Sequence, residues 1–242
     1  MLFRSRISAV LIVKNERQNI VDCLEDLNWA DDLVVLDTGS DDDTAALAKN
    51  CGARVFHQEK WEGFGRAKQE VVSLALYDWI LSIDADERIS AELKRELIRL
   101  REVDFENKAW QIKRLSYYLG KPIRYCGWQN DKPLRLFNRK FGGFNDKAVH
   151  ESIKVSQEKE ICKGLIYHHT YPDASSHFRK MRFYAELAKD STNKRALPLE
   201  PEIRAALKFI KMYFLKLGFL DGLHGFLLCK NSAWGIWYKY RL

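Results

Sequence analysis

Three short polar segments, each placed directly after a run of apolar residues, hold the side chains best suited to chemistry. They are Lys14-Asn15-Glu16, Asp37-Thr38-Gly39 and Asp84-Ala85-Asp86-Glu87. A carboxylate in such a place can accept hydrogen bonds from a base or a ribose hydroxyl. Two neighbouring carboxylates suit a hard divalent cation that shares its coordination shell with phosphate oxygens. The segments therefore indicate a site for a phosphorylated ligand and a divalent ion.

Simpler interpretations exist for the same acids. Asp37 can serve only to cap the helix that follows it, and most Asp-x-Asp segments are solvated turns. The third segment favours the functional interpretation. If the chain is extended there, Asp84 and Asp86 point the same way and Ala85 leaves room between them.

A fourth segment places cations near these acids. Gly63 and Gly65 open a predicted helix that continues with Arg66 and Lys68. Backbone N–H groups at a helix start, together with either cation, suit a diphosphate. The alternative for Lys68 is a basic, solvated helix face.

The elements that must position these side chains follow from the apolar pattern of the first hundred residues. Strands are expected at 7–13, 33–36, 54–57 and 79–83, and helices at 19–27, 65–76 and 91–102. A further helix, capped by the segment Asp41-Asp42-Asp43-Thr44, is expected to run through Lys49. This alternation predicts right-handed βαβ units and a largely parallel sheet covered on both faces. Ligands of such sheets bind beyond the carboxyl ends of the strands, which is where the polar segments lie.

The rest of the chain has a different pattern. Strands are expected at 109–119, 134–138 and 152–155, followed by helices at 175–189 and 202–217. The fold class is therefore α/β, with a Rossmann-like first half, a mixed second half and a helical tail.

Composition excludes several classes of protein. The chain has 242 residues, of which 46% are hydrophobic and 30% charged, so it is neither disordered nor, lacking a run of about 20 apolar residues, an integral membrane protein. Residues 1–13 are expected to form a buried strand rather than a signal peptide. The five cysteines form no C-x-x-C pair, which argues against zinc or disulfides and fits a reducing cytoplasm.

The net charge of +7 is concentrated at the end of the chain. Residues 203–242 hold seven Lys or Arg against one acid, which leaves 33 basic and 32 acidic residues before them. This basic and aromatic tail favours contact with an anionic membrane surface. The expected contact residues are Lys208, Lys211, Lys216, Trp234 and Trp237. The alternative is a helix that packs its aromatic residues on the domain and leaves its lysines solvated.

Taken in this order and spacing, the four segments resemble glycosyltransferase family 2, whose members have the GT-A fold. The resemblance covers about residues 7–100. It implies that the nucleotide-sugar site contains Asn15, Glu16, Asp37, Arg66 and Asp84, with Asp37 at uracil and Arg66 facing the donor. It also implies that Asp84 and Asp86 hold Mg²⁺ or Mn²⁺. The family commonly has a second acid after the position of Asp37, where this chain has Thr38.

Inverting transferases of this family need a carboxylate that takes a proton from the acceptor hydroxyl. Arg135-Leu136-Phe137 and His150-Glu151 resemble acceptor-side motifs of bacterial lipopolysaccharide-core beta-glucosyltransferases, a subgroup of the family. We expect Glu151 to be this base, with His150 orienting it, and Asp131 is the alternative. By the same resemblance His168 is a further metal or phosphate ligand, although a single strand histidine is more often structural.

The resemblance implies three segments. These are a nucleotide-sugar-binding half at 1–105, an acceptor-side half of the same GT-A domain at 106–190, and a membrane-associating tail at 191–242. It implies an inverting hexosyltransferase that uses a UDP-sugar, UDP-glucose foremost, with the lipopolysaccharide inner core as its lipid-linked saccharide acceptor. Its place would be the cytoplasmic face of a bacterial inner membrane.

Two other classes of function share parts of this pattern. A nucleotidyltransferase acting on a sugar phosphate would share the sheet and the acids, but it would normally have a glycine-rich loop where this chain has Lys14-Asn15-Glu16. A nucleic-acid-binding protein would explain the basic tail. We expect no nucleic-acid partner, because the tail contains no helix-turn-helix, zinc-finger or RNA-binding signature.

Overall fold

The computed structural model describes residues 5–102, 108–145, 151–189 and 199–241. The chain forms two compact units. The first unit consists of Met1–Arg114 and Lys132–Tyr167, and the second of Leu115–Asp131 and His168–Leu242. These limits differ from the three segments expected from the sequence, because strands β6 (Lys108–Tyr118) and β11 (Glu158–Tyr171) each have residues in both units.

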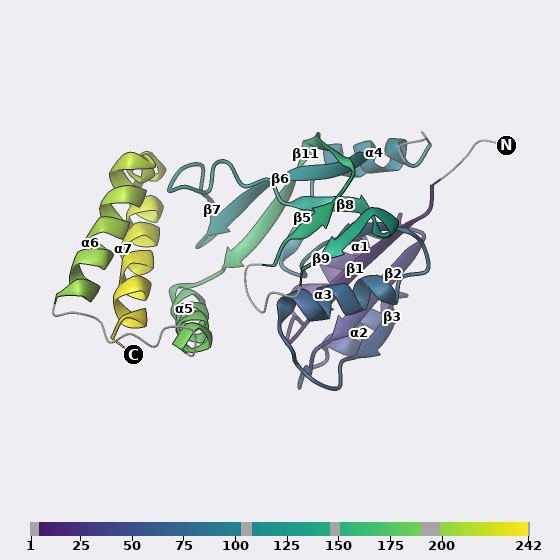
Figure 1. The fold of residues 1–242 in the computed structure, drawn as a ribbon, viewed down its shortest axis with the longest axis horizontal. Coiled ribbons are helices and arrows are strands. Elements are labelled where there is room, and N and C mark those ends of the chain that lie inside the picture. The colour runs from purple at the N-terminus through teal and green to yellow at the C-terminus, as the bar shows by residue number, and fades with distance from the viewer. Residues whose placement is uncertain (1–4, 103–107, 146–150, 190–198, 242) are drawn as a thin grey trace. The chain divides into compact units, whose positions relative to one another are not determined.

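The strands of the first unit begin with a parallel set. β1 (Ile7–Val13) lies between β2 (Asp32–Asp37) and β4 (Trp79–Ser82), and β3 (Arg54–His57) pairs with β2. β8 (Leu134–Asn138) then pairs with β4 in the antiparallel direction, as β6 does with β8. Within the described residues the sheet order is β3-β2-β1-β4-β8-β6-β11-β5, where β5 is Glu87–Ile89 (Figure 1).

The remaining strands are short. β7 (Lys121–Pro122) pairs with the end of β6, while β9 (Gly142–Phe144) and β10 (Ile153–Val155) form a separate antiparallel pair. A single 3-10 turn, η1 (Arg139–Phe141), joins β8 to β9.

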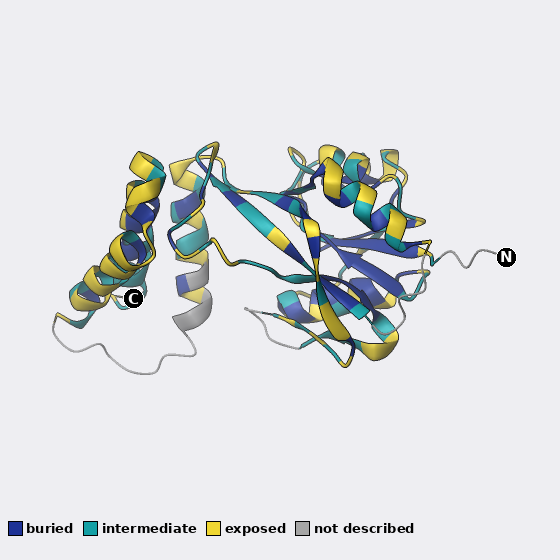
Figure 2. Cartoon of the chain, turned by 90° about the horizontal axis from the view of Figure 1, so that it is seen from above, coloured by how far each residue is buried: buried dark blue, intermediate teal, exposed yellow. Residues whose placement is uncertain are grey.

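Two apolar cores cover the two faces of the parallel strands. Alternate residues of β1, such as Leu11, pack with buried residues of α1 (Ile20–Asp26), α2 (Thr44–Asn50) and α4 (Ala91–Leu100). On the other face, Val10 packs with α3 (Phe64–Ser73). The period-2 alternation of strand side chains therefore fills both cores, as expected for a strand buried on both faces. Strands β1, β2 and β4 are almost entirely buried, and Figure 2 shows the centre of the sheet in dark blue.

The sequence-based elements of the first half agree with this architecture. Strands at 54–57 and 134–138 have the predicted limits, and Ser90 caps α4 by accepting a hydrogen bond from the N–H of Leu93 at 3.1 Å. The expected parallel sheet with helices on both faces is confirmed.

The second unit is mainly helical. It contains α5 (Ala174–Lys189), α6 (Glu200–Ile210), the π-helical turn η2 (Lys211–Leu215), the 3-10 turn η3 (Gly218–Asp221) and α7 (Gly222–Lys239). The helix expected at 202–217 is therefore wrong in one respect, because regular α-geometry ends at Ile210. A small core formed by Tyr118, Ile123, Cys126, Met212, Leu228 and Cys229 holds the unit together.

No single helix of the described residues is long and apolar enough to cross a membrane. Two helical segments, Glu200–Leu215 and Gly218–Lys239, meet those limits of length and composition when taken as one pair with a 74° bend.

Candidate active site

The ends of the parallel strands bring the first two polar segments together. Val13, the last residue of β1, is in register with Asp37, the last residue of β2. Asn15 has a positive φ of 57°, and its backbone N–H donates to Ser40 Oγ at 2.9 Å. Its side-chain oxygen accepts from the N–H of Asp41 at 3.0 Å. Asn15 therefore ties the first segment to the loop after β2.

Asp37 is buried and organises that loop. One oxygen accepts hydrogen bonds from the N–H groups of Gly39 at 3.0 Å and Ser40 at 2.7 Å. The other oxygen lies 3.9 Å from Nδ1 of His57, the last residue of β3. Asp37 thus shapes its own turn rather than capping α2, whose first residue is Thr44.

Glu16 lies in the loop between β1 and α1. Its backbone N–H donates to Thr44 Oγ1 at 2.9 Å, and its carboxylate accepts from Asn19 Nδ2 at 2.7 Å. Both interactions fix the loop after β1 against α2 and the start of α1.

The third polar segment is a turn and not an extended strand. The N–H of Glu87 donates to the carbonyl of Asp84 at 2.9 Å, and a Glu87 carboxylate oxygen accepts from the N–H of Asp84 at 3.0 Å. The expectation that Asp84 and Asp86 converge because the chain is extended is therefore wrong. Arg88 strengthens the turn by donating to the carbonyl of Ala85 at 2.9 Å.

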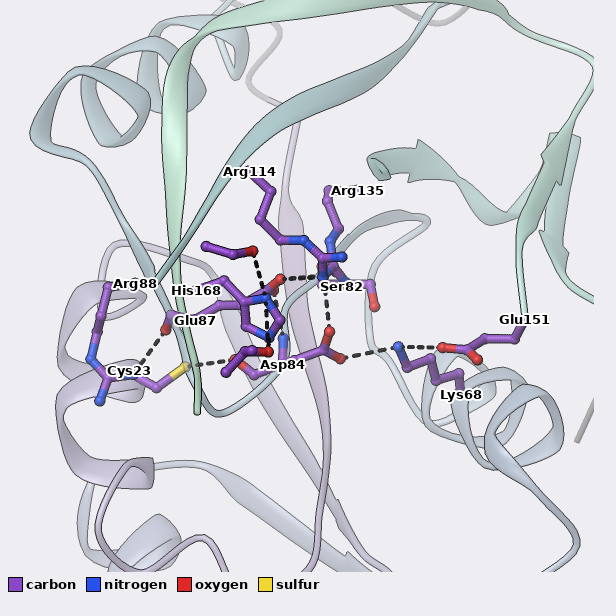
Figure 3. Close-up of polar contacts among 12 residues, drawn as sticks. Cys23, Lys68, Ser82, Asp84, Glu87, Arg88, Arg114, Arg135, Glu151 and His168 are labelled. Carbon is purple, nitrogen blue, oxygen red and sulfur yellow. Dashed lines mark hydrogen bonds and ion pairs between the residues drawn. The ribbon is translucent and has the colours of Figure 1, made fainter. Parts of the chain in front are cut away.

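A network of charges surrounds Asp84 (Figure 3). One of its oxygens lies 3.0 Å from Lys68 Nζ and the other 2.9 Å from Arg135 Nη2. Arg135 also pairs with the fully buried carboxylate of Glu87, which Arg114 approaches to 3.2 Å. The cations reach Asp84 from α3 and β8, so helix and sheet both position this acid.

Burial and charge oppose each other in this network. Burial favours the neutral form of Asp84, but the positive charges of Lys68 and Arg135 outweigh it and hold the pKa of Asp84 well below its usual value. Burial also lowers the pKa of Lys68, yet the attraction of Asp84 and Glu151 leaves that pKa raised. Asp84, Lys68 and Arg135 are therefore charged at neutral pH.

Glu151 joins the same network. Its carboxylate lies 2.8 Å from Lys68 Nζ, so one ammonium group bridges the predicted donor-site acid and the predicted base. Asp131, the alternative base, belongs to the second unit, where its N–H donates to the carbonyl of Trp128 at 3.3 Å. His150 lies outside the described residues.

A divalent ion fits this turn only if substrate phosphates supply part of its coordination shell. The described residues contain no group of three or more acidic, histidine or cysteine side chains suited to hold a metal ion. Both oxygens of Asp84 are in ion pairs, while Asp86, half-buried in the same turn, supplies another carboxylate. Magnesium often binds through one or two carboxylates plus substrate phosphates, and these residues fit that arrangement.

Two other predicted ligands have partners of their own. Arg66 lies on α3 and forms an exposed ion pair with Glu62 at 2.7 Å. Glu62 stands four residues earlier in the sequence, just before the helix begins. His168, in the second unit, contacts the hydroxyl groups of Ser116 at 3.2 Å and Thr170 at 2.8 Å. Its predicted role as a metal or phosphate ligand stays a prediction.

The buried cations of this network differ most from the expectation. The interpretation of Lys68 as part of a solvated helix face is wrong, because only 9% of its side chain is exposed. The burial of Arg135 could be predicted from the sequence, because it is a lone cation in the apolar strand Leu134-Arg135-Leu136-Phe137. Such a residue inside a sheet requires a buried acid as its partner.

Comparisons with known proteins agree with this geometry. The family model described as glycosyl transferase family 2 matches residues 8–111. A glycosyltransferase of Rickettsia typhi is 30% identical over 236 residues, which cover 91% of this chain and 80% of the relative. The lipopolysaccharide core biosynthesis glycosyltransferase LpsC of Rhizobium meliloti is 29% identical over 242 residues, covering 96% and 90% of the two chains.

One solved structure shares the fold over nearly the whole chain. The crystal structure of S. aureus TarS residues 1–349 has a TM-score of 0.50 and 14% identity, and the match covers 98% of this chain and 91% of that one. The expected GT-A architecture, a large sheet flanked by helices, is confirmed. With the strand-end acids, the family model and the relatives in agreement, this chain belongs to glycosyltransferase family 2.

Proposed function

We propose that this chain transfers a hexose, glucose foremost, from a UDP-sugar to a saccharide of the lipopolysaccharide inner core. The observation that carries the proposal is the ion-pair bridge of Lys68 between Asp84 and Glu151. It joins an acid at the end of a parallel strand, where nucleotides bind, to a carboxylate suited to accept a proton. The relative LpsC supports the choice of acceptor.

On the donor side, the loops after β1 and β2 would receive the nucleoside. Asn15, Glu16 and Asp37 lie there, and one oxygen of the buried Asp37 lies 3.9 Å from Nδ1 of His57. That oxygen can accept from the N–H of a uracil ring. Asp86 would hold Mg²⁺ or Mn²⁺ together with diphosphate oxygens, and the ion would neutralise charge on the leaving group.

On the acceptor side, Glu151 would act as the general base. The acceptor oxygen forms a bond to the anomeric carbon while the bond from that carbon to the diphosphate breaks. The hydroxyl proton passes to the Glu151 carboxylate, and the electron pair leaves with UDP. Attack opposite the leaving group inverts the anomeric centre. Lys68 would hold the carboxylate in position through the 2.8 Å ion pair.

The proposed acceptor and the proposed nucleotide-sugar donor also indicate where in the cell the protein acts. A lipid-linked core saccharide is made where nucleotide sugars are present, so the proposed place of action is the cytoplasmic face of a bacterial inner membrane, with the protein attached peripherally.

A donor screen tests the proposed function. The full-length protein is incubated with UDP-glucose, UDP-galactose or GDP-mannose, Mn²⁺ and a deacylated inner-core acceptor, and the released nucleotide is identified. We expect acceptor-dependent release of UDP, fastest with UDP-glucose, and none from the Asp86→Ala variant. Formation of pyrophosphate from UTP and glucose 1-phosphate, without UDP release, would instead establish a nucleotidyltransferase.

A further inference from the structure

One side of α6 and of the π-helical turn η2 that follows it is apolar and exposed. Ile203, Leu207, Ile210 and Phe214 follow one another at helical spacing, and 47–60% of each residue is accessible. A surface helix of a soluble protein normally turns such a stripe toward the core. Figure 2 shows many residues of this helical pair in yellow, the colour of exposed residues.

Further exposed apolar residues follow at the bend and in the first turns of α7. We call the whole set the apolar hairpin surface, and it consists of Ile203, Leu207, Ile210, Phe214, Leu215, Leu217, Phe219, Leu220, Leu223 and Phe226. All ten are large, and all are more than a third exposed. Exposed apolar groups of this extent mark an interaction site.

Close packing and hydrogen bonds fix the backbone of the bend between α6 and α7. Gly218 is buried, and a Cβ there would lie 2.8 Å from the carbonyl oxygen of Met212 and 2.9 Å from Cys126 Sγ. Asp221 accepts hydrogen bonds from the N–H groups of Arg124 at 3.0 Å and Tyr125 at 2.9 Å. The apolar side chains are therefore exposed from a fixed backbone.

Three lysines lie among the apolar residues. In the part of the chain that the structure describes, Lys208, Lys211 and Lys216 form no ion pair with a carboxylate. By contrast, Arg204 pairs with Glu200 at 2.7 Å, and Arg241 pairs with Glu202. The surface thus carries uncompensated positive charge, which complements an anionic partner.

The tryptophans expected at the membrane are used inside the unit. The Trp237 indole donates to Glu202 at 3.1 Å, and Trp234 packs edge-on against Phe178 with ring centroids 4.8 Å apart. The surface available for contact with a partner is therefore the apolar hairpin surface of α6 and the bend, and not these two rings.

We propose that the apolar hairpin surface inserts into the interfacial layer of an anionic lipid bilayer, with Lys208, Lys211 and Lys216 at the level of the headgroups. Apolar residues of an interfacial helix bury in the acyl boundary while lysines attract anionic lipids. A second copy of this chain fits less well, because two such surfaces would bring the same unpaired lysines together. The inference is independent of the reaction that the first unit catalyses.

Vesicle flotation of the full-length protein tests this inference. The lipids are phosphatidylcholine alone or with 30% phosphatidylglycerol, and the variants are Leu207→Glu/Phe214→Glu and Lys211→Glu/Lys216→Glu. The matched control is Leu76→Glu/Ile161→Glu, which replaces two equally exposed apolar residues of the first unit. We expect the wild type and the control to bind anionic vesicles, and each hairpin variant to bind at least about tenfold more weakly.

Three results would overturn the inference. They are binding of Leu207→Glu/Phe214→Glu equal to that of the wild type, retention of the protein after alkaline carbonate washing, and a concentration-dependent dimer that this variant abolishes. If Leu207→Glu/Phe214→Glu fails to fold, vesicle binding of Lys211→Glu/Lys216→Glu provides the test instead. UDP release on a soluble acceptor is measured for each variant, and unchanged release separates loss of membrane binding from failure of the proposed reaction.

Discussion

Replacing Lys68 with Met tests the charge network at the heart of the site. The substitution keeps most of the buried aliphatic stem and removes the ammonium group that lies 3.0 Å from Asp84 and 2.8 Å from Glu151. Arg135 still pairs with Asp84 at 2.9 Å, so Glu151 loses more than Asp84 does.

The expected loss of stability follows from burial. Breaking a buried ion pair by removing one partner costs about 3–5 kcal/mol. Because Arg135 compensates part of the charge on Asp84, we expect the lower end, about 3 kcal/mol, for the free energy of unfolding at pH 7. The side chains of Lys68, Asp84 and Glu151 are 9%, 29% and 19% exposed, so solvent screens the pair only in part.

The difference between Lys68→Met and the wild type also depends on pH. The pKa of Asp84 is lowered on folding, so its contribution is present above the ordinary value of 3.8 and is lost as the pH falls through the folded value. The pKa of Lys68 is raised, so its contribution is present below the ordinary value of 10.5 and is lost as the pH rises through the folded value. The difference should therefore be largest between these limits and shrink at lower and higher pH.

Urea unfolding at several pH values measures these effects. The control is Lys108→Met, which removes an exposed ion pair with Glu160 and should change stability far less. If Lys68→Met and Lys108→Met have equal stabilities at pH 7, the inference that Lys68 is a buried bridging cation is refuted.

Three further predictions concern single sites. Asp86→Ala should abolish the protection against thermal unfolding that UDP and Mn²⁺ together give the wild type; an equal rise in melting temperature on adding both ligands to the variant would contradict its metal role. Burial and nearby Lys180 lower the pKa of His177 from 6.5 to about 4, so wild-type stability should fall by roughly 3 kcal/mol as the pH drops from 6.5 to 4, and His177→Gln should flatten this slope in urea titrations. Gly164→Ala should lower the free energy of unfolding by about 1–3 kcal/mol, and with it the urea midpoint, because the alanine Cβ would lie 2.4 Å from the backbone of Leu93. An unchanged midpoint would show that β11 and α4 can separate freely.

The strands and the place of the site could be predicted because local pattern decides them. Apolar runs buried on both faces give parallel strands, and the acids that follow them must gather at the carboxyl edge of the sheet. Asp37 and Asp84 are there for that reason. The burial of Val10 and Leu11 in opposite cores shows the same local control.

The partners of the site residues could not be predicted, because they depend on tertiary contacts. Lys68 on α3 meets Glu151 across more than eighty residues of chain, and no spacing rule links the two. The turn at Asp84 has no signal in the apolar pattern, because the Glu87 carboxylate forms it by accepting from the N–H of Asp84. The exposed stripe of α6 has the pattern of a core-facing helix, and only the structure shows that it faces outward.

The central claim is that Glu151, held by Lys68, takes the proton from the acceptor hydroxyl. The most direct test is the single-turnover rate of Glu151→Gln at saturating UDP-sugar and acceptor, with the donor Kd measured on the same preparation. The claim predicts a rate about 10²- to 10⁴-fold below that of the wild type and a donor Kd changed by less than roughly threefold. A wild-type rate in Glu151→Gln, or the same loss in Asp131→Asn instead, would contradict it.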